Sequence, residues 1–279
     1  MLSIKDHLTV VYVMVADFLG KHPAMAAWRQ SNNGHPEFTD AEIITIGLMQ
    51  SYFRTTTLKR TYLLVRANDP HAFPKCCSYK QWLGRLHRLS VQIGGLIAEI
   101  AQASASPLPF YFVDAEPIPM CHPVRHVRVR LLREDGAYFG KTSKGLFFGF
   151  KLHLLVTVDG LIVQAILTPG NWDDREVVTA LVQAVSNGSA CLGDRGYRRP
   201  ELQAELLEQD GVLLFTRADA GKEYQALLCS VRERVETTFS QLWERLATRV
   251  YSRSWLGLWN TLLLKMLDHS FSLAGLIPA

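Results

Sequence analysis

Three acidic residues stand where their carboxylates could act together. Asp114 directly follows the apolar run 110–113, and Asp194 directly follows the apolar run 190–193. Each run is typical of a short buried strand. Glu236 lies beside the apolar stripe of a predicted helix. Carboxylates that converge repel one another unless cations lie between them, so a shared site predicts bound divalent metal.

The chemistry that such a site favours is phosphodiester cleavage. Mg²⁺ prefers hard oxygen ligands, and two ions about 4 Å apart can stabilise the attacking and leaving oxygens of an in-line displacement. Singly, each acid has an ordinary structural explanation. Asp114 could be a turn residue or a helix cap, and Asp194 could pair with Arg195. Glu236 could be the i, i+4 partner of Arg232. Only the three acids taken together predict a shared metal site.

The elements that must position these acids follow the order of a ribonuclease H-like fold, an α/β mixed sheet with helices on both faces. Predicted strands cover 110–113, 147–158, 161–167, 190–193 and 212–215, and predicted helices cover 174–185, 200–209, 230–248 and 256–273. Asp159-Gly160 predicts a hairpin between the second and third strands. The first and fourth strands of this fold are adjacent and parallel, so Asp114 and Asp194 should lie close together at their ends.

The preceding residues, 1–105, are predicted to form an all-helical module, and 106–279 the ribonuclease H-like domain. Thr39 with Glu42 forms a capping-box sequence ahead of an apolar run, and another helix is predicted from Ser78. Basic residues are spread through this module: Lys59, Arg60, Arg66, Lys75, Lys80, Arg85 and Arg88. They suit DNA binding, although an ordinary solvated helix surface explains them equally well.

A second basic segment lies at 125–151, where seven basic residues accompany two acidic ones. Several glycines within it predict loop for much of its length. We expect Lys141, Lys144 and Lys151 to contact DNA phosphates, which would make binding depend on salt.

Two residues near these segments have competing interpretations. Trp172 follows Asn171 in a predicted loop, where core packing or a role as a loop anchor is favoured over stacking on a base. Strand alternation puts His153 on the same face as Lys151. His153 could approach the acids, or it could be a satisfied histidine within the sheet.

Composition adds weaker constraints. A net charge of +4 over 279 residues permits nucleic-acid binding without indicating it. The five cysteines include no CxxC pair, which predicts neither a disulfide framework nor a zinc site and favours a reducing compartment. Charged residues interrupt the apolar segments near both ends, so we interpret these as packed helices and expect no membrane association.

Six segments resemble, in the same order, insertion-sequence DDE transposases of the type named for insertion sequence 982. They are FTDAEIIT (38–45), VDAEPIP (113–119), FGFKLH (148–153), LTPGN (167–171), GDRGY (193–197) and RVETTFS (234–240). The resemblance extends over about 38–271. It implies a cytoplasmic, nucleoid-associated prokaryotic enzyme that acts as a homodimer on inverted-repeat transposon ends and on target DNA.

The resemblance also implies roles for residues. Asp114, Asp194 and Glu236 would hold two Mg²⁺ ions, with Mn²⁺ as a substitute. Water would attack the transposon end, and the 3′ hydroxyl that is released would attack target DNA. Arg232 would contact DNA near the cut.

Two other positions are less well defined by the resemblance. Related families place a lysine seven residues after the glutamate, where this chain has Trp243, so no role is carried over; Arg245 could serve instead. Asp174 lies where many relatives have an acid, although a helix cap explains it equally well.

Two other functions would use the same residues differently. A ribonuclease H-like nuclease would share the acids and metals without joining DNA strands. An inactive relative would bind DNA as a regulator, although the complete set of acids speaks against it.

Overall fold

The computed structural model describes residues 3–26, 36–128, 132–142, 145–216, 219, 236–242, 244 and 252–277. It separates into two compact units. One comprises Met1–Glu99 together with Leu242–Ala279, and the other comprises Ile100–Gln241. We refer to them as the helical unit and the sheet unit.

The helical unit combines helices with one buried face and helices that are buried nearly all round. Its described helices are α1 (Ile4–Lys21), η1 (Pro23–Ala26), α2 (Asp40–Tyr52), α3 (Leu58–Asn68), α4 (Tyr79–Leu86), α5 (Ser90–Ser104), whose last turn enters the sheet unit, and α9 (Trp255–Leu273). α1 is of the first kind, and α2 and α9 are of the second. The predicted capping box of Thr39 with Glu42 begins α2, and Ser78 with Gln81 forms a second box at α4. Trp82 of α4 is fully buried and donates its indole N–H to the Ile43 carbonyl.

The C-terminal helix α9 belongs to the helical unit, whereas the predicted division assigned 106–279 to one domain. Its residues pack against α2, where Leu264 fills the space beside Gly47. Lys265 Nζ lies 3.3 Å from Ser51 Oγ, and Asn260 donates to the His87 carbonyl. The apolar pattern of 256–273 correctly predicted a packed helix but did not specify which unit it packs in.

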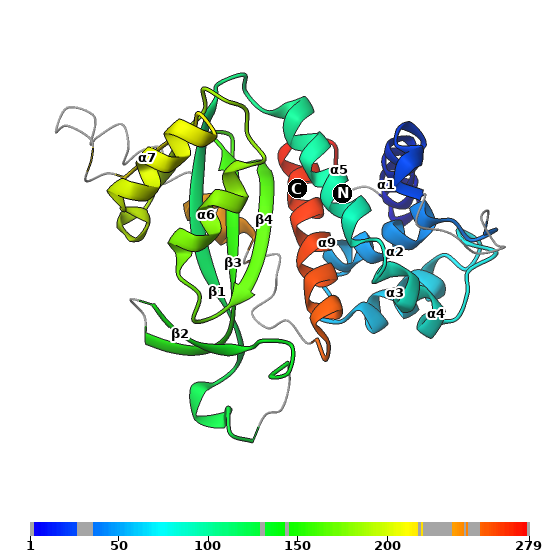
Figure 1. Cartoon of the computed structure of the whole chain (residues 1–279). Helices are drawn as coiled ribbons and strands as arrows, with labels where there is room; N and C mark the ends of the chain where they lie inside the picture. Colours follow the sequence, from blue (N-terminus) through cyan, green and yellow to red (C-terminus); the bar gives the residue numbers. More distant parts are fainter. Residues whose placement is uncertain are drawn as a thin grey trace. The chain divides into compact units, whose positions relative to one another are not determined.

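The sheet unit contains a six-stranded mixed sheet in the order β2-β3-β1-β5-β6, with β4 also paired to β3 (Figure 1). Its strands are β1 (Phe110–Cys121), β2 (Tyr138–Thr142), β3 (Gly145–Thr157), β4 (Ile162–Pro169), β5 (Ala190–Gly193) and β6 (Leu213–Thr216). β3 runs antiparallel to β1 and β4, and β5 runs parallel to β1 and β6. Apart from β2, this is the strand arrangement expected for a ribonuclease H-like fold.

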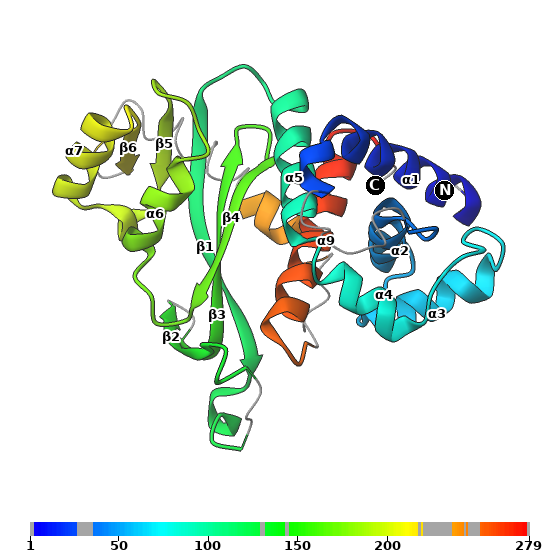
Figure 2. The same ribbon diagram turned by 45° about the vertical axis from the view of Figure 1, so that its right-hand side comes forward.

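Helices lie on both faces of this sheet. On one face, α6 (Asp174–Val182) and α7 (Pro200–Gln209) share an apolar cluster with the sheet that includes Val113, Leu155 and Val178. The helical segment 236–241, orange in Figures 1 and 2, lies on the other face. The predicted α/β mixed sheet with helices on both faces and a helical N-terminal region is therefore confirmed.

Two predictions about strands were wrong. The first strand does not end before Asp114 but continues to Cys121, paired with β3 throughout. The strand includes Pro117 and Pro119, although proline cannot donate to a ladder. N–H groups two residues apart point to the same strand edge, and the ladder with β3 continues through both prolines. The missing donors therefore fall on the edge away from β3.

The second error is a strand that was missed in the basic segment 125–151, which was predicted to be loop for much of its length. Within it, β2 pairs with the first residues of β3, from Tyr138 opposite Gly149 to Thr142 opposite Gly145. Gly140 lies in β2 and permits a close approach, because a Cβ at this position would lie 2.3 Å from the Gly170 carbonyl oxygen.

Two further findings bear on the composition argument. The described cysteines, Cys76, Cys77, Cys121 and Cys191, are all free, as predicted. Within the described part of the chain, no helix is both long and apolar enough to cross a membrane.

Candidate active site

Asp114 lies within β1, and Asp194 directly follows β5, the adjacent strand. β1 and β5 are parallel and are paired from Phe110 opposite Ala190 to Phe112 opposite Leu192. Each acid therefore comes two residues after the last position at which these two strands are paired. The prediction that the first and fourth predicted strands are adjacent and parallel is confirmed, although β1 itself runs on past Asp114.

Alternation along the strands determines which face Asp114 occupies. Val113 and Cys191 point into the apolar cluster beneath α6. Asp194 comes after β5 has ended, whereas Asp114, the residue after Val113 on β1, lies on the opposite face. That is the face on which segment 236–241 lies in Figures 1 and 2.

Local backbone contacts orient both aspartates. Asp114 is half-buried, and its Oδ1 accepts a 2.8 Å hydrogen bond from the Ala115 N–H. Asp194 is exposed, and its Oδ1 accepts a 2.6 Å bond from the Gly196 N–H within the turn η3 (Arg195–Tyr197). A Cβ on Gly196 would lie only 2.9 Å from that oxygen, so the turn needs a glycine to hold the carboxylate this closely.

Glu236 lies at the start of the described helical segment and is exposed. Phe239 and Leu242, three and six residues on, are buried and form the inner face of the segment. The predicted helix is therefore found over 236–242, with Glu236 beside its apolar stripe rather than within it. Arg232, Trp243 and Arg245 fall outside the described residues.

Tyr197 is a buried residue whose pKa is affected by several nearby carboxylates. Its side chain is 1% exposed, and no described group hydrogen-bonds its hydroxyl. Burial raises the pKa of Tyr197 well above its usual value, and the carboxylates of Asp174, Asp114, Asp194 and Asp173 raise it further. Four carboxylates thus act on one buried hydroxyl, which the sequence did not single out beyond its place in the GDRGY segment.

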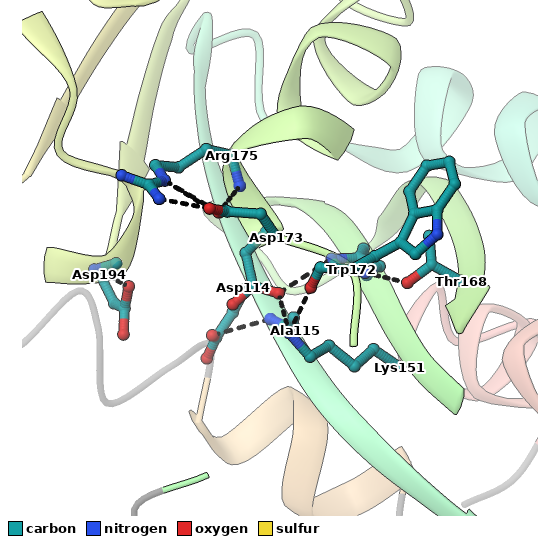
Figure 3. A network of polar contacts seen from close by, with 11 residues as sticks. Asp114, Ala115, Lys151, Thr168, Trp172, Asp173, Arg175 and Asp194 are labelled. Atoms are coloured by element: carbon teal, nitrogen blue, oxygen red, sulfur yellow. Dashed lines mark hydrogen bonds and ion pairs between the residues drawn. The ribbon is translucent and has the colours of Figure 1, made fainter. Parts of the chain in front are cut away.

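The loop between β4 and α6 is held by Lys151. Its Nζ donates to Asp174 Oδ1 at 2.8 Å and to the Trp172 carbonyl at 2.7 Å (Figure 3). The Lys151 side chain is only 15% exposed, so its charge is already engaged within the protein. Lys141, in contrast, is exposed on β2, and Lys144 lies outside the described residues.

His153 is fully buried beside this ion pair. Its Nε2 bonds Thr168 Oγ1 at 2.8 Å, and its Nδ1 lies 4.0 Å from Asp174 Oδ1. His153 and Lys151 thus share a face, as predicted. Burial lowers the pKa of His153 to about 4, although Asp174 opposes the shift, so the ring is neutral at pH 7.

Asp173, not Asp174, caps helix α6. Its carboxylate accepts from the Arg175 backbone N–H at 3.0 Å and is paired with the Arg175 guanidinium. That guanidinium lowers the pKa of Asp173 to about 2. The interpretation of Asp174 as the cap was therefore wrong, and this residue is the ion-pair partner of Lys151 instead.

Trp172 is exposed, which overturns the expectation that it packs in the core. Its side chain is 47% exposed, while Trp82 is completely buried. In Figure 3 the indole points away from Asp173 and Arg175. The position of Trp172 between a strand end and a helix cap leaves no apolar layer for the ring to enter.

The donor set at this site suits a hard divalent cation. Asp114 and Asp194 supply carboxylate oxygens from adjacent strands, and such oxygens are the ligands that a hard divalent cation prefers. Among the described residues, however, no three His, Cys, Asp or Glu side chains lie close enough to hold a metal ion together.

A comparison with protein families shows to which family this chain belongs. The family described as transposase DDE domain matches residues 105–249, just over half of the chain. This protein therefore belongs to the transposase DDE domain family, whose members act on DNA and generally use divalent metal ions. No curated protein and no solved structure gave a significant match.

Proposed function

We propose that this protein is a transposase of the insertion sequence 982 type, which cleaves transposon ends and joins the released 3′ hydroxyl to target DNA. The observation that supports this proposal is the parallel pairing of β1, which contains Asp114, with β5, which Asp194 directly follows, in a chain of the transposase DDE domain family. Glu236 begins the segment 236–241, which lies on the face of the sheet away from α6 in Figures 1 and 2, and it is the proposed third acid.

Asp114, Asp194 and Glu236 would hold two Mg²⁺ ions, and Mn²⁺ would substitute for them. Such ions supply Lewis-acid stabilisation of the attacking and leaving oxygens. The chain itself orients the carboxylates: backbone N–H groups of Ala115 and Gly196 each occupy one oxygen of an aspartate. Because these contacts limit rotation of the side chains, they reduce the ordering needed when metal and DNA bind.

Basic residues outside the acidic site would bind the DNA backbone. We propose Lys141 and Lys144 as phosphate contacts in the basic segment, and Arg232 as a contact near the cut. A direct phosphate contact by Lys151 would require breaking its ion pair with Asp174, so we assign Lys151 to holding the loop. The basic helical module 1–105 is proposed to bind inverted-repeat DNA, with a homodimer pairing two transposon ends.

The proposal is tested by replacing single acids in the full chain. Asp114→Asn or Asp194→Asn removes a charge at constant shape, and cleavage of transposon-end DNA in Mg²⁺ should fall by roughly 10³-fold or more, while DNA binding persists. Glu208→Gln, an exposed acid on α7, is the matched control and should leave cleavage unchanged.

The products separate the alternatives. Strand transfer into target DNA supports a transposase. Cleavage without joining would indicate a nuclease, and DNA binding without any metal-dependent nicking by the wild-type protein would indicate a regulator.

A further inference from the structure

Trp172 is an exposed indole on a rigidly held loop. The Trp172 N–H donates to the Pro169 carbonyl at 3.1 Å, and its own carbonyl accepts from Lys151. On one side, Gly170 donates to the Gly149 carbonyl at 3.0 Å. On the other, Asp173 caps α6. These contacts fix the loop backbone on both sides of Trp172. The ring, which is 47% exposed, is therefore presented to solvent from a defined position.

Substitution within this loop would disturb it. A Cβ on Gly170 would lie 2.6 Å from the Tyr138 carbonyl oxygen and 3.0 Å from the Gly149 carbonyl oxygen. The loop is therefore packed directly against β2 and β3. A single exposed apolar residue is ordinary on a protein surface. An exposed tryptophan in a loop this constrained, however, is well placed to contact a partner outside the chain.

The loop lies beside the strand pair that contains Asp114. Asp174, two residues after Trp172, lies 4.0 Å from His153 Nδ1, and His153 is paired with Ala115, the residue after Asp114. The indole points away from Asp173 and Arg175 in Figure 3, so a planar ligand can lie against it without displacing the Asp173 carboxylate. If the proposed function is correct, a base next to a phosphate held at Asp114 would meet this loop.

We propose that Trp172 stacks on a nucleobase next to the phosphate that is cleaved, and that Lys151 is the positioning residue that holds the loop for it. This inference rests on the proposed function. Aromatic rings stack on bases with little sequence preference, because every base presents a flat π-face. Stacking would thus fix the position of the strand at the cut, whereas specificity for the inverted repeat would come from other contacts.

The test uses the full-length protein and end DNA containing an abasic nucleotide at each position around the cut in turn. Binding is measured by fluorescence anisotropy in Ca²⁺, to limit cleavage. Trp172→Ala should bind intact DNA about 5- to 150-fold more weakly, while Trp172→Phe should retain most of the affinity. Leu207→Ala, which shortens a side chain that is 52% exposed on α7, is the control and should bind normally.

One abasic position should weaken binding by the wild-type protein and have no added effect on Trp172→Ala, because both changes remove the same contact. Equal affinity of Trp172→Ala and wild type, or abasic effects that add to the substitution at every position, would overturn the inference. The abasic series on the wild-type protein does not depend on how any variant folds. Failure of the wild-type protein to cleave transposon ends would instead reject the proposed function, and the inference with it.

Discussion

Among individual residues, burial decides the behaviour of the polar groups around Asp174. Lys151 donates hydrogen bonds to Asp174 and to the Trp172 carbonyl. His153, a few ångströms away and fully buried, is neutral because burial outweighs the attraction of Asp174. The pair shows how one carboxylate can have a charged and an uncharged neighbour on the same strand face.

The neutral state of His153 predicts a loss of stability in acid. An unfolded histidine takes up a proton near pH 6.5, whereas folded His153 does so only near pH 4. Between these values the unfolded state binds more protons, so lowering the pH favours unfolding, by about 3 kcal/mol when complete. Urea unfolding at a series of pH values from 7.5 to 4.5 measures the slope.

His153→Gln is the matched variant for this measurement, since glutamine can bond Thr168 but does not titrate in this range. Its free energy of unfolding should depend less steeply on pH than that of the wild-type protein. Identical slopes for the two proteins would show that His153 is not the titrating group.

Among the elements, the pairing of β1 with β3 is limited by one glycine. A Cβ on Gly149 would lie 2.1 Å from the Ile118 carbonyl oxygen, a backbone atom that cannot turn aside. The close approach of these strands matters to the site, because β1 carries Asp114 and β3 carries Lys151. The two strands must therefore stay in register for the loop and the acids to keep their positions.

Gly149→Ala should accordingly destabilise the sheet unit by about 1–3 kcal/mol or more, as the strands move apart to relieve the overlap. Gly84→Ala is the same substitution in α4, where an added Cβ meets nothing within 4 Å. It should leave stability unchanged or raise it by up to about 1 kcal/mol, because alanine favours helix. Thermal unfolding of both variants compares them, and equal midpoints would contradict the close-approach argument.

At the scale of the whole molecule, residues from both ends of the chain form the helical unit. α9 contributes a nearly continuous buried surface, including Leu258, Leu262, Leu264, Met266, Leu267 and Phe271. The sheet unit is inserted between the N-terminal helices and α9. Folding of the helical unit therefore requires residues that are separated in sequence by the whole sheet unit.

Leu264→Ala should destabilise the helical unit by about 2–5 kcal/mol, because it leaves a cavity against Gly47. Hydrogen exchange should then accelerate in α2 and remain unchanged in β3. Leu276→Ala, at a position that is 40% exposed, should change little in either element. Equal acceleration in α2 and β3 would show that the two units unfold together.

Local patterns along the chain were sufficient for much of this structure. The capping box of Thr39 with Glu42, the bounds of β5 and α7, and the adjacency of β1 and β5 were all predicted from the sequence. They could be predicted because caps, proline at a first turn and short apolar runs act over a few positions. The choice of Asp114, Asp194 and Glu236 also came from the sequence, through the elements they follow and the family resemblance.

Other features depend on residues that are distant in sequence. The continuation of β1 through two prolines requires β3 as a neighbour, and the place of α9 requires α2. The exposure of Trp172, the ion pair of Lys151 with Asp174 and the acidic surroundings of Tyr197 arise only where β3, β4, α6 and η3 meet. Burial and charge are properties of such three-dimensional neighbours, so only the tertiary structure could decide them.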